Sequence, residues 1–329
     1  MSEYLLEVKD LSVEYQTDDG VVQAVTDLQL GIRKGETLGL VGETGAGKTT
    51  TALSIMQLVP NPPGVIVKGE VLYKGVDLLK KKPEHMRRIR GNKISMIFQD
   101  PMTSLNPVMT VGFQIEEAII LHQKVGKKEA REQAEKMLEL VGIPKNRIED
   151  YPHEFSGGMR QRVGIAMALS CNPEILIADE PTTALDVTIQ AQVLDLMKTL
   201  RKEFGTAMML ITHDLGVVAE ACNYVAIMYA GSVVEYASVE QLFNNPKHPY
   251  TKGLFNSIPS LDEEVDRLNP IKGLMPDPSD LPPGCRFHPR CPMARDICSQ
   301  QGPKPVSVSE GHMVSCLIYE GLVPGYEEE

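Results

Sequence analysis

Residues 42–49 read Gly42-Glu43-Thr44-Gly45-Ala46-Gly47-Lys48-Thr49. They follow a short apolar run at 37–41 and precede a segment with helical patterning at 49–58. The spacing fits G-x-x-x-x-G-K-[ST], in which the glycines let backbone N–H groups curl around phosphate oxygens at the start of a helix. In such a loop the lysine reaches the β- and γ-phosphates, and the final hydroxyl binds Mg²⁺. An ordinary glycine-rich turn seldom matches all of these positions, so we expect a strand–loop–helix phosphate site.

A second apolar run, at 175–178, ends in two carboxylates. Asp179 stands at the tip of the expected strand, where it can hold Mg²⁺ through water because Mg²⁺ keeps much of its hydration. Glu180 follows and can orient or deprotonate an attacking water. The alternative is a strand that simply ends in a polar loop, which is common. Together with the phosphate loop, the two carboxylates predict an α/β domain that hydrolyses a nucleoside triphosphate.

Length and composition argue against several other classes of protein. The 329 residues are 42% hydrophobic, enough for one large α/β domain and a smaller appendage. The net charge is −11 and there is no tryptophan, whereas nucleic acids are bound by basic surfaces and stacking aromatics. The sequence has no run of about 18 apolar residues, as a membrane span requires, and residues 1–10 do not resemble a signal peptide. We therefore expect a cytosolic chain that does not bind nucleic acid.

The pattern of apolar residues changes along the chain. The first 35 residues alternate as strands do, whereas 111–141 show helical spacing and predict a helical insert in the α/β core. Apolar strands return at 175–178 and 208–212. After about residue 260 the chain becomes rich in proline, which helices and sheets accept poorly. This last segment needs something other than regular secondary structure to fix it.

The stretch before the acidic strand carries the most specific signal. It reads Phe155-Ser156-Gly157-Gly158-Met159-Arg160-Gln161-Arg162. Together with the phosphate loop, it resembles the ABC transporter ATPases, whose signature reads LSGGQ. Phe155 replaces leucine and Met159 replaces glutamine. The phosphate contacts are expected from Ser156 and from the backbone of the two glycines, so binding should survive while the role of the missing glutamine stays open.

The resemblance covers residues 5–245 and implies a role for each matching position. The implied ATP-binding residues are Tyr15, which stacks on adenine, Gly42, Glu43, Thr44, Gly45, Ala46, Gly47, Lys48, Thr49, Thr50 and the Q-loop glutamine Gln99. The implied Mg²⁺ set is Thr49, Gln99 and Asp179. Catalysis is implied for Glu180 and for the switch histidine His213, and Asp186 belongs to the D-loop. Ser156, Gly157 and Gly158 are implied to cap the ATP held by a partner subunit, so the working unit is a dimer whose ATP joins two half-sites.

Taken singly, these residues have ordinary structural explanations. Tyr15 suits a half-buried strand position, and Gln99 suits a turn. Asp186 and the pair His213-Asp214 suit caps of the helices that follow. The ordered set, rather than any one member, favours the ATPase.

Two further stretches indicate a branch of the family. Residues 99–107 and 245–251 resemble the dipeptide and oligopeptide importers, a branch that also includes importers of nickel and other small solutes. The resemblance implies two separate membrane permease subunits, contacted near Pro101 to Pro107, and indirectly an extracellular peptide-binding protein. It places the chain on the cytoplasmic face of the cell membrane, as a homodimer or as a heterodimer with a related ATPase subunit.

Four of the six cysteines crowd the C-terminus with the spacing C-x5-C-x6-C-x17-C. Four thiolates in a segment short of core-forming residues suit an iron–sulfur cluster or Zn²⁺. The wide spacings lack the tight C-x2-C knuckles of zinc ribbons, and the resemblance also favours a [4Fe–4S] cluster, carried by some dipeptide importer ATPases. Zn²⁺, free thiols and disulfides are the alternatives. The implied ligands are Cys285, Cys291, Cys298 and Cys316.

These observations predict a P-loop ABC ATPase core, a mixed sheet flanked by helices, with an antiparallel β subdomain and a helical subdomain. The ATPase domain is expected over 1–259, with the helical subdomain at about 100–165. A small, irregular, Pro- and Cys-rich metal-cluster extension is expected over 260–329. The predicted function is ATP hydrolysis that energises import of di- and oligopeptides, with nickel or another small solute as the alternative cargo. A soluble ABC ATPase without transport and a redox regulator are the remaining alternatives.

Overall fold

The computed structural model describes residues 4–100, 104–183, 186–257 and 271–323. The contacts divide the chain into two compact units. Unit 1 comprises Met1–Leu6, Ile32–Thr37 and Tyr73–Thr212, and unit 2 comprises Glu7–Gly31, Leu38–Leu72 and His213–Glu329. The helical insert and the acidic strand therefore belong to unit 1. The phosphate loop and the cysteine-rich segment belong to unit 2.

The first sheet of unit 2 is built from long N-terminal strands in the order β2-β1-β4. Buried residues alternate along β1 as predicted, but the alternation slips by one residue between Val8 and Leu11, where Asp10 has a φ of 48°. Such a slip is the mark of a β-bulge. The strands are β1 (Leu6–Thr17), β2 (Gly20–Ile32) and β4 (Gly64–Tyr73).

A second sheet of unit 2 places the phosphate loop. β3 (Thr37–Val41) is buried along its whole length, pairs in parallel with β9 (Tyr224–Tyr229), and leads into the loop and helix α1 (Lys48–Ile55). β9 continues through a two-residue turn into β10 (Ser232–Ser238). Ala230 and Gly231 in that turn have φ values of 44° and 84°, the positive values that a tight hairpin of this twist requires. Helix α8 (Leu215–Ala221) precedes β9.

The C-terminal segment continues this second sheet. Strand β12 pairs antiparallel with β10 and with β11, so the strand order is β11-β12-β10-β9-β3. The prediction of an irregular tail is thus wrong for residues 305–315, which form a hairpin. The tail's remaining described residues are mostly turns. The elements are α9 (Val239–Asn244), α10 (Pro249–Asn256), η3 (His288–Arg290), η4 (Asp296–Ser299), β11 (Pro305–Ser309) and β12 (His312–Ser315).

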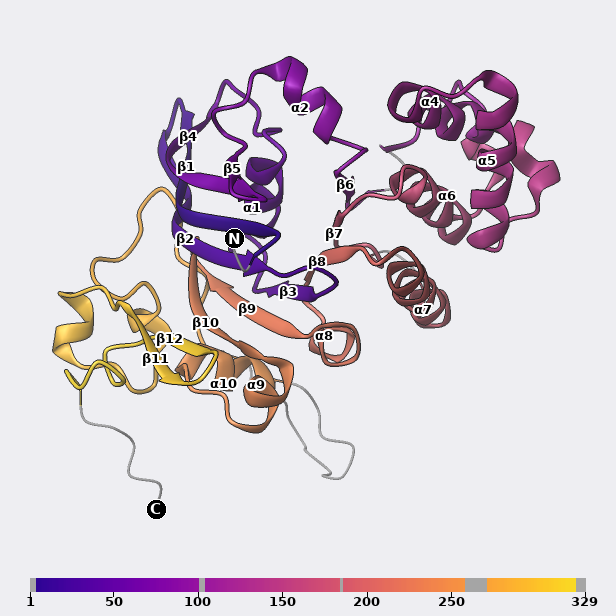
Figure 1. Ribbon diagram of the computed structural model, residues 1–329. Helices are drawn as coiled ribbons and strands as arrows, with labels where there is room; N and C mark the ends of the chain where they lie inside the picture. Colours follow the sequence, from indigo (N-terminus) through magenta and orange to yellow (C-terminus); the bar gives the residue numbers. More distant parts are fainter. Residues whose placement is uncertain (1–3, 101–103, 184–185, 258–270, 324–329) are drawn as a thin grey trace. The chain divides into compact units, whose positions relative to one another are not determined.

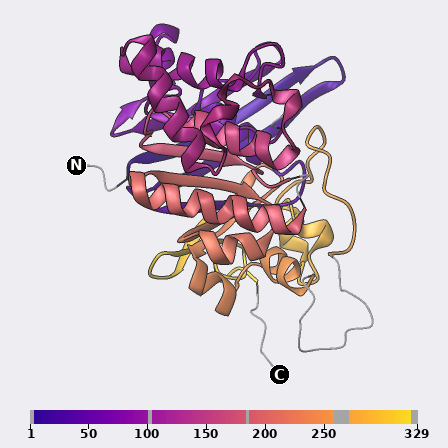
Figure 2. The ribbon, with the colours of Figure 1, turned by 90° about the vertical axis from the view of Figure 1, so that its right-hand side faces the viewer.

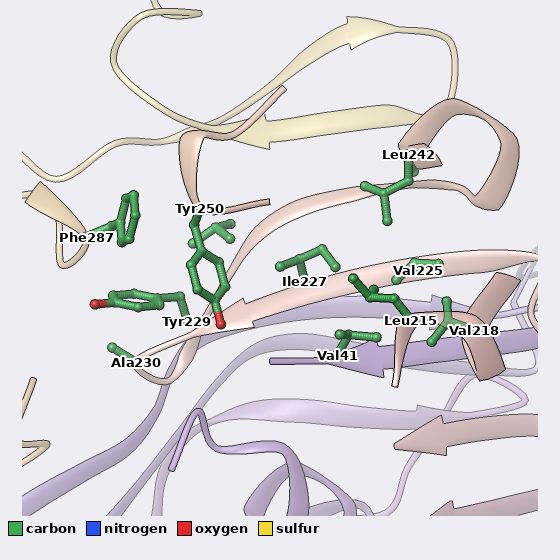
Figure 3. Close-up of a cluster of buried hydrophobic side chains, with 12 residues drawn as sticks. Val41, Leu215, Val218, Val225, Ile227, Tyr229, Ala230, Leu242, Tyr250 and Phe287 are labelled. Atoms are coloured by element: carbon green, nitrogen blue, oxygen red, sulfur yellow. The ribbon is translucent and has the colours of Figure 1, made fainter. Parts of the chain in front are cut away.

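An apolar cluster holds the second sheet, its helices and the tail together (Figure 3). Tyr229, Tyr250 and Phe287 meet edge to face in its centre, with ring centroids 4.7 to 5.4 Å apart. A buried polar contact adds to the attachment. The His312 imidazole lies 2.7 Å from the Glu235 carboxylate, which also accepts the backbone N–H groups of Lys247 and His248. The tail is therefore packed into unit 2.

Unit 1 contains three parallel strands in the order β8-β7-β6. All five residues of β7 and all six of β8 are buried, as expected for parallel strands covered on both faces. The three strands are β6 (Ile94–Ile97), β7 (Ile175–Asp179) and β8 (Ala207–Thr212). Unit 1 also contains α2 (Pro83–Ile89), α7 (Val187–Phe204) and the two-residue strand β5 (Val76–Asp77), which belongs to the other sheet.

The predicted helical insert lies between β6 and β7. Helices α4, α5 and α6 pack on one another and form one group in Figures 1 and 2 (magenta). Their bounds are α4 (Val111–Gln123), α5 (Lys127–Leu140) and α6 (Gly157–Leu169), with short turns η1 (Lys145–Glu149) and η2 (Pro152–Glu154) between α5 and α6. The patterning of 111–141 correctly predicted the first two helices. The domain boundaries at 100, 165 and 259 stay predictions.

Candidate nucleotide site

The phosphate loop of unit 2 has the strand–loop–helix setting that the sequence predicts. Gly47 has a φ of 99°, and a Cβ atom there would lie 2.3 Å from the carbonyl oxygen of Ala24, so only glycine fits. The carbonyl of Ala46 accepts a hydrogen bond of 3.0 Å from the backbone N–H of Gly231, in the β9–β10 turn. The neighbouring strands therefore fix the loop's path.

Lys48 lies inside the loop and is 7% exposed. Its Nζ donates to the carbonyls of Gly42 and Glu43, at 2.7 and 3.1 Å. Thr44, Gly45 and Thr49 are exposed, so the outer face of the loop and the hydroxyl at the start of α1 are accessible. The arrangement presents backbone N–H groups, an ammonium and a helix N-terminus to an anionic ligand.

Tyr15 and Thr50 lie beside each other in unit 2. The Tyr15 hydroxyl is 3.3 Å from Thr50 Oγ1, which places the tyrosine of β1 next to the helix that follows the phosphate loop. Tyr15 is half-buried, so its position is also consistent with a tyrosine that only packs against the sheet. Its stacking on adenine stays a prediction.

Glu43, the second residue of the loop, has partners that the sequence did not indicate. Its backbone N–H donates to the hydroxyl of Tyr250, at 3.1 Å. Its carboxylate accepts from Arg290 Nη1, at 3.0 Å. Tyr250 belongs to the stretch 245–251, which resembles the importer branch, and nothing in the local pattern indicates a role for Arg290.

In unit 1, the structure brings Gln99 and Glu180 together. Glu180 Oε2 accepts from Gln99 Nε2 at 3.1 Å and from the hydroxyl of Thr183 at 2.9 Å. Glu180 has a φ of 44°, an uncommon value for a residue with a side chain, and its N–H donates to Ile211 in β8. Strained backbone of this kind is concentrated at functional sites. Asp179, just before it, is 2% exposed at the end of β7.

The signature stretch lies at the start of α6. The Ser156 side chain accepts from the N–H of Met159 and so caps the helix, which begins at Gly157. A Cβ on Gly158 would lie 2.6 Å from Ile189 of α7, so close helix packing also requires this glycine. Ser156 is exposed, which leaves a helix N-terminus open to an anion.

The two carboxylates with a possible capping role do cap helices. Asp186 accepts from the N–H of Ile189 at 3.0 Å at the start of α7, and Asp214 accepts from two N–H groups at the start of α8. His213 is exposed in unit 2. Capping accounts for the side-chain position of Asp186, and its D-loop role stays a prediction. Residues 101–103 of the expected permease contact and 184–185 beside Asp186 lie outside the described residues.

The four tail cysteines are all partly buried. The N–H of Cys285 donates to the carbonyl of Cys298 at 2.8 Å, so these two cysteines lie on adjacent turns. Burial raises the pKa of Cys291 and of Cys316 to about 11. Over the described ranges, no group of three or more His, Cys, Asp or Glu side chains is placed to hold a metal ion. The [4Fe–4S] cluster expected at these cysteines stays a prediction.

Exposed apolar side chains gather at the start of α4. Val108, Met109 and Phe113 are 73%, 38% and 46% exposed. The buried amide of Gln114 bonds to the backbone at Asn106 and Met109 and so fixes the loop that carries the first two. Sequence patterning did not indicate Gln114.

None of the described helices has the length and apolarity needed to cross a bilayer.

Two family models match the chain. Residues 25–183 match the model described as ABC transporter, and residues 234–298 match the model described as oligopeptide/dipeptide transporter, C-terminal region. The oligopeptide transport ATP-binding protein AppD of Bacillus subtilis is 54% identical over 318 residues, 96% of this chain and 97% of that protein. The dipeptide transport ATP-binding protein DppD of the same organism is 50% identical over 320 residues, 97% of this chain and 96% of that protein.

Solved structures of ATP-binding cassettes are also similar to this chain. A dimeric post-hydrolysis state of the ATP-binding cassette MJ0796, bound to ADP and Pi, is similar with a TM-score of 0.65 and 27% identity, and covers 71% of this chain and 98% of that chain. The cassette cbiO1 of Clostridium perfringens has a TM-score of 0.63 and 26% identity, covering 74% and 92%. These cassettes share the mixed sheet flanked by helices that the sequence predicted. The chain belongs to the ABC transporter family, as one of its ATP-binding proteins.

Proposed function

We propose that this chain hydrolyses ATP to energise the import of di- and oligopeptides through partner membrane permeases. The observation that carries the proposal is the phosphate loop, fixed by close backbone contacts, in a chain that is similar over almost its full length to peptide-transport ATP-binding proteins. The match of residues 234–298 to the oligopeptide/dipeptide transporter region supports the cargo class.

In this proposal, the loop's N–H groups and Lys48 bind the phosphates. Thr49, Gln99 and Asp179 hold Mg²⁺, and Tyr15 and Thr50 complete the ATP site. Glu180 orients the attacking water and accepts its proton, while the Gln99 amide holds the carboxylate in place through their hydrogen bond. His213 assists in catalysis.

A dimer completes the site. Ser156 and the two glycines at the exposed start of α6 bind the ATP held by a second ATPase subunit, because a helix N-terminus favours negative charge. Asp186 belongs to the same partner-facing set. The second subunit is a copy of this chain or a related one.

The permeases bind near Pro101 to Pro107, and an exposed apolar patch follows this stretch directly in the sequence. The patch formed by Val108, Met109 and Phe113 is apolar and exposed, as protein-binding surfaces often are, and Gln114 hydrogen-bonds to the backbone of the loop that carries the first two residues. This contact places the chain at the cytoplasmic face of the membrane. The extracellular peptide-binding protein acts indirectly, through the permeases.

The four tail cysteines hold a [4Fe–4S] cluster. The number and spacing of these cysteines in a proline-rich segment support this assignment, as does the backbone hydrogen bond that joins Cys285 to Cys298. The cluster, when bound, supplies cross-links within a proline-rich segment. Anaerobic purification followed by iron, sulfide and zinc assays tests this assignment: one zinc per chain, or no metal, would contradict it.

Uptake by cells that lack this gene tests the transport function. Complementation with the wild-type chain should restore uptake of a radiolabelled dipeptide, and Glu180→Gln should not. Restored uptake of Ni²⁺ with unchanged dipeptide uptake would instead favour the nickel alternative. A wild-type chain that affects neither would contradict the transport proposal.

A further inference from the structure

The residue Glu43 ties the phosphate loop to the C-terminal part of unit 2. Its N–H donates to Tyr250, its carbonyl accepts from Lys48 and its carboxylate accepts from Arg290. All three of its polar groups are therefore engaged by side chains. Figure 3 shows Tyr250 beside Tyr229 and Phe287 in the apolar cluster, so the hydroxyl that meets Glu43 sits on a rigid support.

Arg290, the partner of the carboxylate, lies in the cysteine-rich segment next to Cys291. Its side chain is 6% exposed, against 30% for Glu43. Nε donates to the carbonyl of Lys272 at 3.1 Å, and Nη1 contacts both Glu43 and the hydroxyl of Tyr229. A guanidinium buried to this extent requires such partners, and the carboxylate of Glu43 supplies the opposite charge.

A second arginine of the same segment approaches the loop from another side. Arg286 donates to the carbonyl of Ala230 and to the hydroxyl of Thr26. The adjacent Gly231 donates its N–H to Ala46 of the phosphate loop. The segment 285–291 thus contacts the loop directly through Arg290, and contacts its supporting turn through Arg286.

The charge of Glu43 works against the proposed ligand. A carboxylate on a loop that binds phosphate repels the anion, and the repulsion is strong where water is partly excluded. Arg290, the more buried of the two side chains, supplies the opposite charge at 3.0 Å and holds the carboxylate through this contact. We propose that Arg290 is a positioning residue of the ATP site, which sets ATP affinity by neutralising and orienting Glu43. This inference rests on the proposed function, that residues 42–49 bind ATP.

A merely structural ion pair would behave differently. A structural ion pair would stabilise unit 2. Its removal would lower stability but would not change the ATP affinity of the folded protein. In the positioning role, removal of the arginine weakens ATP binding because an uncompensated carboxylate remains, and removal of both charges restores it. The two roles are separated by a double-mutant cycle on affinity.

The experiment measures ATP affinity of the full-length chain by titration calorimetry, without Mg²⁺ to prevent turnover. Arg290→Met should weaken binding about tenfold. The double variant Glu43→Gln/Arg290→Met should return to within about threefold of wild type. Glu43→Gln alone should bind ATP at least as tightly as wild type. Arg295→Met, which removes an exposed arginine of the same segment, is the matched control and should not change affinity.

Steady-state kinetics give a second readout. Arg290→Met should raise KM for ATP and leave kcat nearly unchanged, and Arg290→Lys should lie between Arg290→Met and wild type. Wild-type affinity in folded Arg290→Met, or a double variant as weak as Arg290→Met, would overturn the proposal. If Arg290→Met does not fold, weaker binding by Glu43→Gln would overturn it instead. A wild-type chain that fails to bind ATP contradicts the proposed function itself, which is a distinguishable result.

Discussion

The phosphate loop of unit 2 and the acidic end of β7 in unit 1 differ in the atoms that form them: one uses mainly backbone groups and the other mainly side chains. The loop consists mainly of backbone groups, whose positions are fixed by close contacts with neighbouring strands, as at Gly47 and Ala24. The acidic strand end depends on side-chain atoms, chiefly the carboxylate of Glu180 with its two hydrogen-bond donors. The loop should therefore respond to changes in its supports, and the acidic end to changes in its own functional groups.

Glu180→Gln provides the largest expected effect. It retains the shape of the side chain and removes the base, so turnover should fall about 10² to 10⁴-fold while ATP binding persists. ATPase rate and ATP affinity are measured on the same preparation. Full activity would show that the carboxylate has no catalytic role and would remove the contrast between the two regions.

Gly47→Ala tests the backbone character of the loop. The added Cβ would lie 2.3 Å from a carbonyl oxygen, at a φ that side chains rarely adopt. We expect about 1 to 3 kcal/mol of strain, seen as lower stability or as lost ATP binding. Gly45→Ala is the control, because its φ is also positive but a Cβ there meets nothing within 4 Å. It therefore reports the cost of the backbone conformation without the steric clash. Equal effects of the two changes would mean that the close approach is unimportant.

The support of the loop should weaken in acid. Burial lowers the pKa of His248, whose Nδ1 accepts from the N–H of Tyr250, to about 3. Below pH 6.5 the unfolded chain therefore binds a proton that the folded chain does not, so stability falls as the pH falls from 6.5 towards 3. The slope is about 1.4 kcal/mol per pH unit.

Urea denaturation followed by tyrosine fluorescence measures this slope, since the chain has no tryptophan. His248→Asn retains an acceptor near Nδ1 and does not titrate. It should flatten the dependence between pH 6.5 and 5, and an unchanged slope would assign the acid sensitivity to other groups.

Tyr250→Phe should produce the smallest of these effects. It removes the acceptor for the Glu43 N–H and keeps the aromatic packing with Tyr229 and Phe287. Loss of one such hydrogen bond costs about 1 kcal/mol, or roughly fivefold in ATP affinity if the loop alone absorbs the change. Tyr236→Phe is the control, because that ring stacks on Tyr224 away from the loop.

The sequence predicted those parts of the site that are encoded locally. The strand–loop–helix around Lys48 and the helices of 111–141 follow from spacing and periodicity over short stretches. Tyr250, Arg290 and the pair of Glu235 with His312 were not predicted, because these contacts join residues tens to hundreds of positions apart. Local patterning contains no information about such pairs. The hairpin at 305–315, within a tail whose other described residues are irregular, was missed for the same reason: β12 is a strand because β10 offers it a partner.

The pairing of β12 with β10 also has a consequence for solubility. A strand at the edge of a sheet carries unpaired N–H and C=O groups and can pair with the edge of another molecule. Without the hairpin, β10 would present such an edge; with it, the outermost strand is the short β11, which begins at a proline and has a register shift near its end. Proline and irregular register both discourage further pairing. A chain truncated before residue 305 should therefore self-associate through β10 even where its nucleotide site is intact.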